Sequence, residues 1–220
     1  MSSAPSSGRF DELPPELRSA VQDGLTALDH SPTGELPLGQ RRRIYALLGP
    51  ESRDADNRPT GVGYRRRVLL DVLAAQRALP VWERAHPGDR RPQRMLLLAN
   101  GVVRGTVDRA TAEREMSNFL VDVGSETNPQ DPGPGYAGTA AASVVSTARV
   151  DRHHDDFAAA ESDADLDADA WPTDFLASEA AALATSPEEN AEDRRAFWQW
   201  FLTEAVPNAY LADSVKAEQG

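Results

Sequence analysis

One short stretch of the chain, reading DRHHDD at residues 151–156, places several potential metal ligands next to one another. If the stretch is helical, residues three or four positions apart share a face. Asp151 can then pair with Asp155, and His153 can pair with Asp156. Imidazole and carboxylate groups at this spacing are a donor set that divalent metals accept.

The dipeptide His154-Asp155 resembles the doublet of the HD phosphohydrolases, which are helical metal enzymes. That family also needs an upstream histidine and a downstream aspartate, and neither His30 nor His86 lies in an accompanying motif. We therefore interpret residues 151–156 as a polar, solvated helix end. The alternative is a metal site made by His153, His154, Asp155 and Asp156.

Other patterns that predict catalysis are missing from the sequence. It contains no GxSxG, Walker A, GxGxxG or HExxH motif. It also contains no cysteine, which excludes disulfides, thiolate zinc sites and cysteine nucleophiles. The arginine runs at 41–43 and 65–67 are interpreted as solvated helix faces or partners of acidic residues, with phosphate binding as the alternative. We expect a protein that is not an enzyme and has no cofactor.

The elements that position these residues are predicted to be helices. Apolar residues recur every three or four positions, as at Leu17, Val21, Leu25 and Leu28, while strand signals are scarce. The sequence therefore predicts an all-α, single-domain helical bundle of about seven to eight helices with an acidic loop. The expected helices cover residues 15–28, 38–48, 64–79, 92–98, 108–123, 136–150, 173–183 and a final stretch ending near 206.

Prolines and glycines divide these helices. Pro80 is expected to break or kink the helix 64–79, with Trp82 in a short continuation, and Pro207 is expected to end the last one. Residues 124–135 form the strongest break, which we interpret as a surface loop because each half alone would have a thin core. The predicted organisation is a disordered N-terminus at 1–12, a single helical domain at 13–212 and a flexible C-terminus at 213–220.

No apolar run approaches the roughly 20 residues that cross a bilayer, and the first residues lack a secretory signal pattern. We therefore expect a cytoplasmic protein. The formal net charge of −12 disfavours binding to nucleic acids and anionic membranes, because their phosphates would be repelled. The expected partner is a basic protein; the sequence predicts no oligomeric state.

The charge is unevenly distributed along the chain. Residues 40–94 contain 13 arginines against 6 acids, whereas residues 151–193 contain 14 acids against one arginine. The two regions either pack side by side and offset each other, or the acidic region is a docking face for a cation-rich partner. The candidate face consists of four aspartates expected to be exposed, Asp163, Asp165, Asp167 and Asp169.

Aromatic residues are concentrated near the C-terminus, where residues 194–210 read RRAFWQWFLTEAVPNAY. Because apolar residues cover most of the circumference of this helix, we interpret it as a central core helix. An exposed aromatic hot spot for a partner is the alternative. The predicted core aromatic residues are Trp82, Trp171, Phe197, Trp198, Trp200 and Phe201.

This C-terminal segment resembles the closing helix of a family of all-α immunity proteins from bacterial polymorphic-toxin systems, the set numbered five. The stretches RRRIYALLG at 41–49 and LPVWERAHPGDRRPQRML at 79–96 are also similar, as is the Ala-rich helix followed by an acidic stretch and Trp171. The resemblance implies a non-enzymatic antitoxin that binds a cognate toxin domain and blocks it. The family implies no catalytic residues, and Trp82, Trp198 and Trp200 match its aromatic positions.

Overall fold

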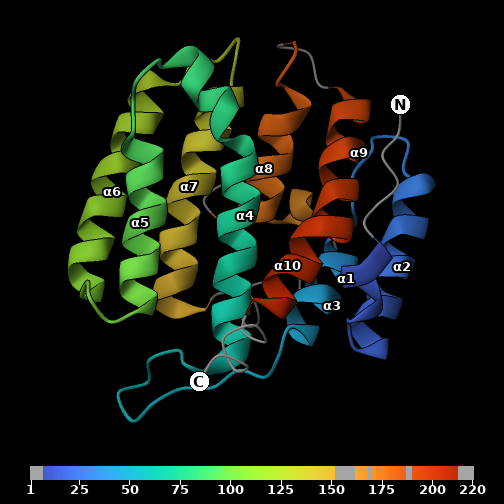
Figure 1. Cartoon of the computed structure of the whole chain (residues 1–220). Helices are drawn as coiled ribbons and strands as arrows, with labels where there is room; N and C mark the ends of the chain where they lie inside the picture. Colours follow the sequence, from blue (N-terminus) through green and yellow to red (C-terminus); the bar gives the residue numbers. More distant parts are fainter. Residues whose placement is uncertain (1–6, 152–161, 168–169, 187–189, 213–220) are drawn as a thin grey trace.

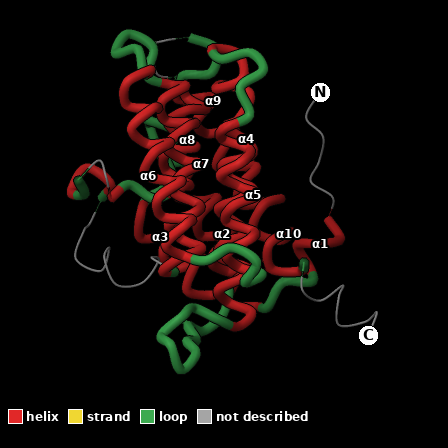
Figure 2. The backbone as a smooth tube through the Cα atoms, turned by 90° about the vertical axis from the view of Figure 1, so that its left-hand side faces the viewer, coloured by secondary structure: helices red, strands yellow, loops and turns green. Residues whose placement is uncertain are grey.

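The computed structural model describes residues 7–151, 162–167, 170–186 and 190–212. Within these ranges the chain is helical and contains no strand, only isolated bridges between Arg53 and Pro59 and between Asn128 and Asp131 (Figure 2). The all-α prediction is therefore confirmed. The helices are α1 (Ser7–Asp11), α2 (Pro15–Asp29), α3 (Leu38–Leu47), α4 (Gly61–Ala85), α5 (Arg91–Val103), α6 (Arg109–Glu126), α7 (Gly133–Val150), α8 (Thr173–Ala182), α9 (Ala191–Trp200) and α10 (Val206–Leu211).

Helix α7 lies at the centre of the bundle and contacts α4, α5, α6 and α8 (Figure 1). Its sequence, GPGYAGTAAASVVSTARV, consists largely of small residues, and most of them are buried. A Cβ atom at Gly138 would lie 2.8 Å from Cζ3 of Trp82 on α4. Small side chains on α7 therefore let neighbouring helices approach it closely.

A second group of helices packs on the other side of α4 and α8. Helix α2 contacts α3 and α9, while α8 contacts both α7 and α9. Side chains from both groups, including Leu28 of α2, Val72 of α4 and Ala141 of α7, belong to one continuous hydrophobic core. The described helices therefore form a single domain.

Several of the expected helix boundaries are wrong, among them the end of the helix expected at 92–98, since α5 runs to Val103. Helix α4 continues through Pro80 as far as Ala85, because Pro80 and Gln76 lie on its solvent side, where the carbonyl that loses its donor can be hydrated. The break predicted at 124–135 is also shorter, since α6 extends to Glu126 and α7 begins at Gly133. Pro134 lies in the first turn of α7, where a proline costs no hydrogen bond.

The C-terminal helix does not end at Pro207. Helix α9 leads into one turn of π-helix, η3 (Phe201–Ala205), which leads directly into α10. The N–H of Val206 donates to the carbonyl of Phe201, five residues earlier, and Pro207 then occupies the first turn of α10. The wider turn thus starts a new helical segment in which the missing N–H of proline is tolerated.

Part of the N-terminus is helical instead of disordered. Residues 7–11 form α1, and Phe10 packs against the core, so the predicted disorder is wrong for this part of residues 1–12. Helix α1 also contacts α10. Residues 1–6 and 213–220, for which disorder and flexibility are predicted, lie outside the described residues. Among the described helices, none combines the length and apolarity needed to span a membrane.

Candidate functional site

The predicted HD-type residues cannot be assigned a structure. His153, His154, Asp155 and Asp156 all lie in residues 152–161, which are outside the described part of the chain. Helix α7 ends just before them at Val150, and Asp151 caps it in the left-handed conformation with φ 54°. The described residues contain no group of three or more histidine, aspartate and glutamate side chains placed to hold a metal ion.

The four aspartates of the predicted acidic face have different positions. Asp163 is only 3% exposed, so the prediction that it is an exposed docking carboxylate is wrong. Asp165 and Asp167 are exposed, and Asp169 lies outside the described residues. Asp163 is the first residue of the short 3₁₀ helix η1 (Asp163–Asp165), which directs this side chain inward.

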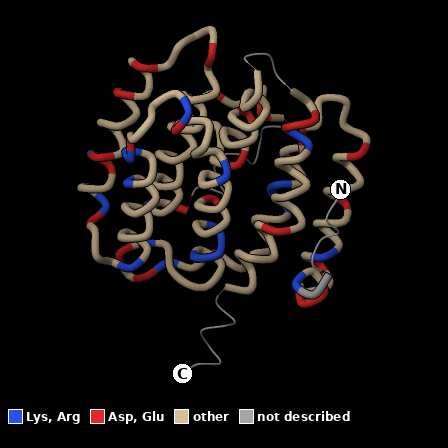
Figure 3. Tube along the Cα trace, turned by 45° about the horizontal axis from the view of Figure 1, so that its top comes forward, with Lys and Arg blue, Asp and Glu red and all other residues tan. Residues whose placement is uncertain are grey.

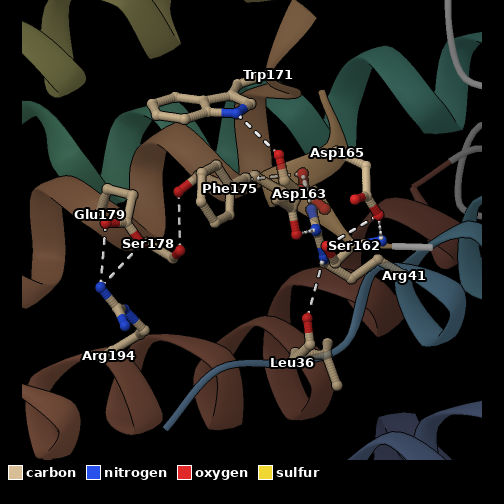
Figure 4. Close-up of polar contacts among 11 residues, drawn as sticks. Leu36, Arg41, Ser162, Asp163, Asp165, Trp171, Phe175, Ser178, Glu179 and Arg194 are labelled. Atoms are coloured by element: carbon tan, nitrogen blue, oxygen red, sulfur yellow. Dashed lines mark hydrogen bonds and ion pairs between the residues drawn. The ribbon is translucent and has the colours of Figure 1, made fainter. Parts of the chain in front are cut away.

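Arg41 on α3 neutralises the buried carboxylate of Asp163 (Figure 4). Its Nη2 donates to Oδ2 of Asp163, and its Nη1 donates to Oδ1 of Asp174 on α8 at 3.0 Å. The Nε atom donates to the carbonyl of Leu36 at 3.2 Å. Burial opposes the charge on Arg41, but Asp174 and then Asp163 raise its pKa above the ordinary value. The guanidinium therefore stays charged between two buried carboxylates.

Aromatic rings surround this ion-pair cluster. The guanidinium carbon of Arg41 lies 5.7 Å from the ring centroid of Phe175 and 5.3 Å from that of Trp198. The indole N–H of Trp171 donates to the backbone carbonyl of Asp163 at 3.1 Å (Figure 4). Cation–π contacts of this kind strengthen when the cation is desolvated. The rings thus help to bury the arginine and connect η1 to α8 and α9.

The η1 segment is also held by its own capping box. The N–H and the hydroxyl of Ser162 both donate to Oδ2 of Asp165, at 2.8 and 3.0 Å. Together with the Arg41 pair, this arrangement fastens residues 162–166 to the domain from the inside. The acidic segment is thereby anchored at Asp163, while Asp165 and Asp167 remain accessible.

Glu35, in the loop between α2 and α3, lies beside Asp163. Burial and the negative charge of Asp163 raise the pKa of Glu35, against the opposing effect of Arg41 and Arg194. If Glu35 and Asp163 are both ionised, neither carboxylate can donate a hydrogen bond to the other. Oδ1 of Asp163 accepts no hydrogen bond from the described residues. A proton on Glu35 would therefore relieve the repulsion and supply the missing donor.

Two further buried ion pairs lie in the bundle; pairing with acids is one of the interpretations given for the run that contains Arg67, whereas sequence reasoning missed the pair of Arg194. Arg67 on α4 is fully buried and binds both carboxylate oxygens of Asp151 through Nε at 2.8 Å and Nη2 at 2.6 Å. Arg194 on α9 pairs with Glu179 on α8 at 3.0 Å. The sequence did carry a signal for burial in the runs 41–43 and 65–67, because Arg41 and Arg67 each fall on the apolar side of their helix.

The pairs of Arg41 and Arg67 join the basic region 40–94 to the acidic region 151–193. This contact supports the interpretation that the two regions offset each other. The remaining charges are spread over the molecule, and Figure 3 shows basic and acidic residues interleaved along most helices. The uneven charge along the sequence is therefore partly cancelled in space.

The six predicted core aromatic residues all contact the core. Trp82, Phe197, Trp198 and Phe201 are buried, whereas Trp171 and Trp200 are partly buried and pack against it. The guanidinium carbon of Arg77 lies 5.2 Å from the ring centroid of Trp200, so the Arg77 side chain covers part of this ring. The geometry favours the core interpretation over an exposed aromatic hot spot.

The fold thus defines an all-α domain whose most prominent polar groups, within the described residues, bind one another inside the bundle. The family model described as immunity protein Imm5 matches residues 21–208, which is most of the chain. The chain therefore belongs to the Imm5 family of immunity proteins, as the sequence resemblance indicates. A comparison with curated proteins gives no match.

Proposed function

We propose that this protein is a cytoplasmic antitoxin that binds a cognate toxin domain of a polymorphic-toxin system and neutralises it by occupying its surface, without catalysis. The observation that carries the proposal is the match to the immunity protein family over residues 21–208. A match of this length includes α3 to α9 and therefore most of the core. The function of the family is accordingly assigned to the whole helical domain.

The charge of the molecule supports a basic partner. A net charge of −12 attracts a cationic protein surface at long range and repels nucleic acids and anionic membranes. Many proteins that act on nucleic acids have a basic substrate groove, and an acidic inhibitor can associate with such a groove at rates well above the unsteered value. The partner is therefore a basic toxin domain.

The docking surface that we propose is the exposed part of the anchored acidic segment. Asp165 and Asp167 are accessible, and Asp163 holds the segment in place through Arg41. A segment fixed before binding loses less conformational entropy when the complex forms. Asp163 acts in this proposal as an anchor, not as a contact residue.

The test is a titration of the protein into the toxin domain encoded by the adjacent gene, at about 50 and about 300 mM salt, with toxin activity measured in parallel. We expect tight binding that weakens at the higher salt, with loss of toxin activity. An absence of binding and of inhibition would overturn the proposed function.

A double variant tests whether the proposed acidic docking surface contacts the partner. Asp165→Asn combined with Asp167→Asn should slow association by about tenfold at low salt and flatten its salt dependence. The matched control is Asp11→Asn with Asp29→Asn, which makes the same change in net charge at exposed positions elsewhere. Equal association rates for the two double variants would remove this segment from the interface while leaving the antitoxin function intact.

A further inference from the structure

A half-open cavity of about 710 Å³ lies at the end of the bundle where α5 turns into α6. The loop that precedes α4 forms its opposite wall, and both segments meet at the lower end of the molecule in Figure 1. Its polar lining includes Asp54, Arg58, Tyr64, Arg104, Asp108 and Arg109. Val102 and Val103 at the end of α5, Val107 in the turn that follows and Pro59 provide an apolar wall.

Three arginines from different segments line this cavity. Arg104 and Arg109 have neither a hydrogen bond nor an ion pair through their side chains among the described residues. Arg58 has one ion pair, with Asp56 at 3.3 Å, and both side chains are more than half exposed. Such an exposed pair is weak and open to exchange with another anion. The guanidinium donors of the cavity are thus available to a ligand.

The two acids of the lining do not neutralise these arginines by direct contact. Oδ1 of Asp108 accepts from the N–H of Thr111 and caps α6. Oδ1 of Asp54 accepts from the N–H groups of Asp56 and Arg58, which closes the turn before α4. Both carboxylates therefore have local structural roles.

Partial burial weakens the charged state of Arg109. Burial lowers its pKa, and the nearby charges of Arg58 and Arg149 add to this effect, against the opposing influence of Tyr64 and Asp54. The Tyr64 hydroxyl donates to the carbonyl of Ala148 at 2.5 Å, and burial raises its pKa to about 12. Tyr64 is thus a neutral, hydrogen-bonded group of the cavity wall at pH 7. An anion in the cavity would stabilise the charged form of Arg109.

We propose that this cavity binds a small organic dianion, a phosphate monoester or a dicarboxylate, through Arg104, Arg109 and Arg58. Arginine donates paired N–H bonds to both kinds of anion in the same planar geometry. The valines and Pro59 contact the uncharged part of the ligand. This site is independent of the proposed docking segment at Asp165 and Asp167.

Size and charge favour a small molecule over a macromolecule. Cavities of about 300–1,000 Å³ are typical of small-ligand sites. The net charge of −12 repels a nucleic acid, and Asp54 and Asp108 in the lining disfavour a long polyanion. A single compact dianion matches the three arginines of the lining in size and charge.

The test is isothermal titration of the full chain with two probes, AMP and succinate, at constant ionic strength set with sodium chloride. We expect at least one probe to bind with a dissociation constant below about 1 mM. The two probes distinguish a phosphate ligand from a carboxylate ligand. Binding of neither probe below about 10 mM would overturn the proposal.

Two variants locate the site. Arg109→Gln and Arg104→Gln should each raise the dissociation constant of the probe about tenfold or more, because each removes charge-assisted hydrogen bonds. Arg114→Gln is the control, since Arg114 is an exposed arginine of α6 outside the cavity. Unchanged affinity in the two cavity variants, or an equal loss in the control, would place the binding elsewhere and overturn the assignment. Thermal unfolding of each variant verifies that it is folded.

Discussion

Arg41, Arg67 and Arg194 are buried together with the carboxylates that neutralise them. Removing a charge from water is costly, and the attraction within a buried pair returns that cost only when geometry and hydrogen bonding are good. The arginines meet this condition in different ways, since Arg41 bridges two carboxylates and Arg67 binds one through two nitrogens. Removing one partner leaves the other buried and uncompensated.

Arg41→Met tests this at the centre of the cluster. The variant keeps an apolar side chain of similar length but leaves Asp163 and Asp174 buried without their cation. We expect the free energy of unfolding to fall by about 3–5 kcal/mol in urea titrations. Arg43→Met is the control, because the Arg43–Asp23 pair is nearly half exposed and should contribute less than about 1 kcal/mol. Equal losses in the two variants would contradict the role of Arg41.

Glu35→Gln tests the carboxylate pair at Glu35 and Asp163. A pKa raised in the folded state means that protonation of Glu35 stabilises the fold at low pH, and this stability is lost as the pH rises through the folded-state pKa. The amide introduced by the substitution imitates the protonated carboxyl group at every pH. The variant should therefore be more stable than the parent at pH 7, by about 1 kcal/mol, and the gain should vanish below about pH 4.

The measurement is urea unfolding of the parent and of Glu35→Gln between pH 3.5 and pH 7. Glu51→Gln is the matched control, because Glu51 is exposed and its neutralisation should have little effect. A gain from Glu35→Gln that is constant across this pH range would show that the Glu35 charge is not its origin.

At the scale of the element, α7 determines how the helices assemble. Its small residues permit four neighbours to pack around it, and its glycines are placed where a side chain would collide. At Gly138 the added Cβ would lie 2.8 Å from Trp82 and 3.0 Å from Val123, both of which are buried. Neither neighbour can move aside without disturbing the core.

Gly138→Ala should accordingly destabilise the protein by about 1–3 kcal/mol, although alanine is the better helix former. Gly124→Ala in α6 is the control, because nothing lies within 4 Å of its added Cβ. The free energy of unfolding of Gly124→Ala should rise by up to about 1 kcal/mol from the helix propensity alone. Thermal or urea unfolding measures the stability of both variants. A higher stability of Gly138→Ala than of the parent would contradict the close packing of α7 on Trp82.

At the scale of the whole molecule, the net charge of −12 and the buried ion pairs respond differently to salt. Repulsion among exposed acids is screened at moderate ionic strength, whereas buried pairs such as Arg67–Asp151 are screened much less. Salt should therefore relieve the overall repulsion and leave the internal pairs almost unchanged. The same screening weakens the long-range attraction to a basic partner.

Raising sodium chloride from about 20 to about 500 mM at pH 7 should raise the midpoint of thermal unfolding by a few degrees, roughly 2–4 °C. Differential scanning calorimetry measures this shift. A fall in the midpoint would show that exposed ion pairs, such as Arg91 with Glu126, outweigh the repulsion.

The sequence by itself determined the helical class and most of the helix positions. Apolar spacing of three and four residues, as at Leu17, Val21 and Leu28, specifies an amphipathic helix locally, without knowledge of its neighbours. The resemblance to the immunity protein family also came from the sequence, and the family match confirms it. Two of the errors in the elements came from Pro80 and Pro207, because a proline's effect depends on whether its surroundings can hydrate or bypass the freed carbonyl.

Only the tertiary structure decided which charged residues face water. Arg41 and Arg43 are two positions apart in one run of arginines, yet one is buried between carboxylates and the other is nearly half exposed. Asp163 and Asp165 differ in the same way within η1. The spacing of apolar residues only hints at this distinction, because the burial of a charge depends on a partner that another helix, remote in the chain, brings to it.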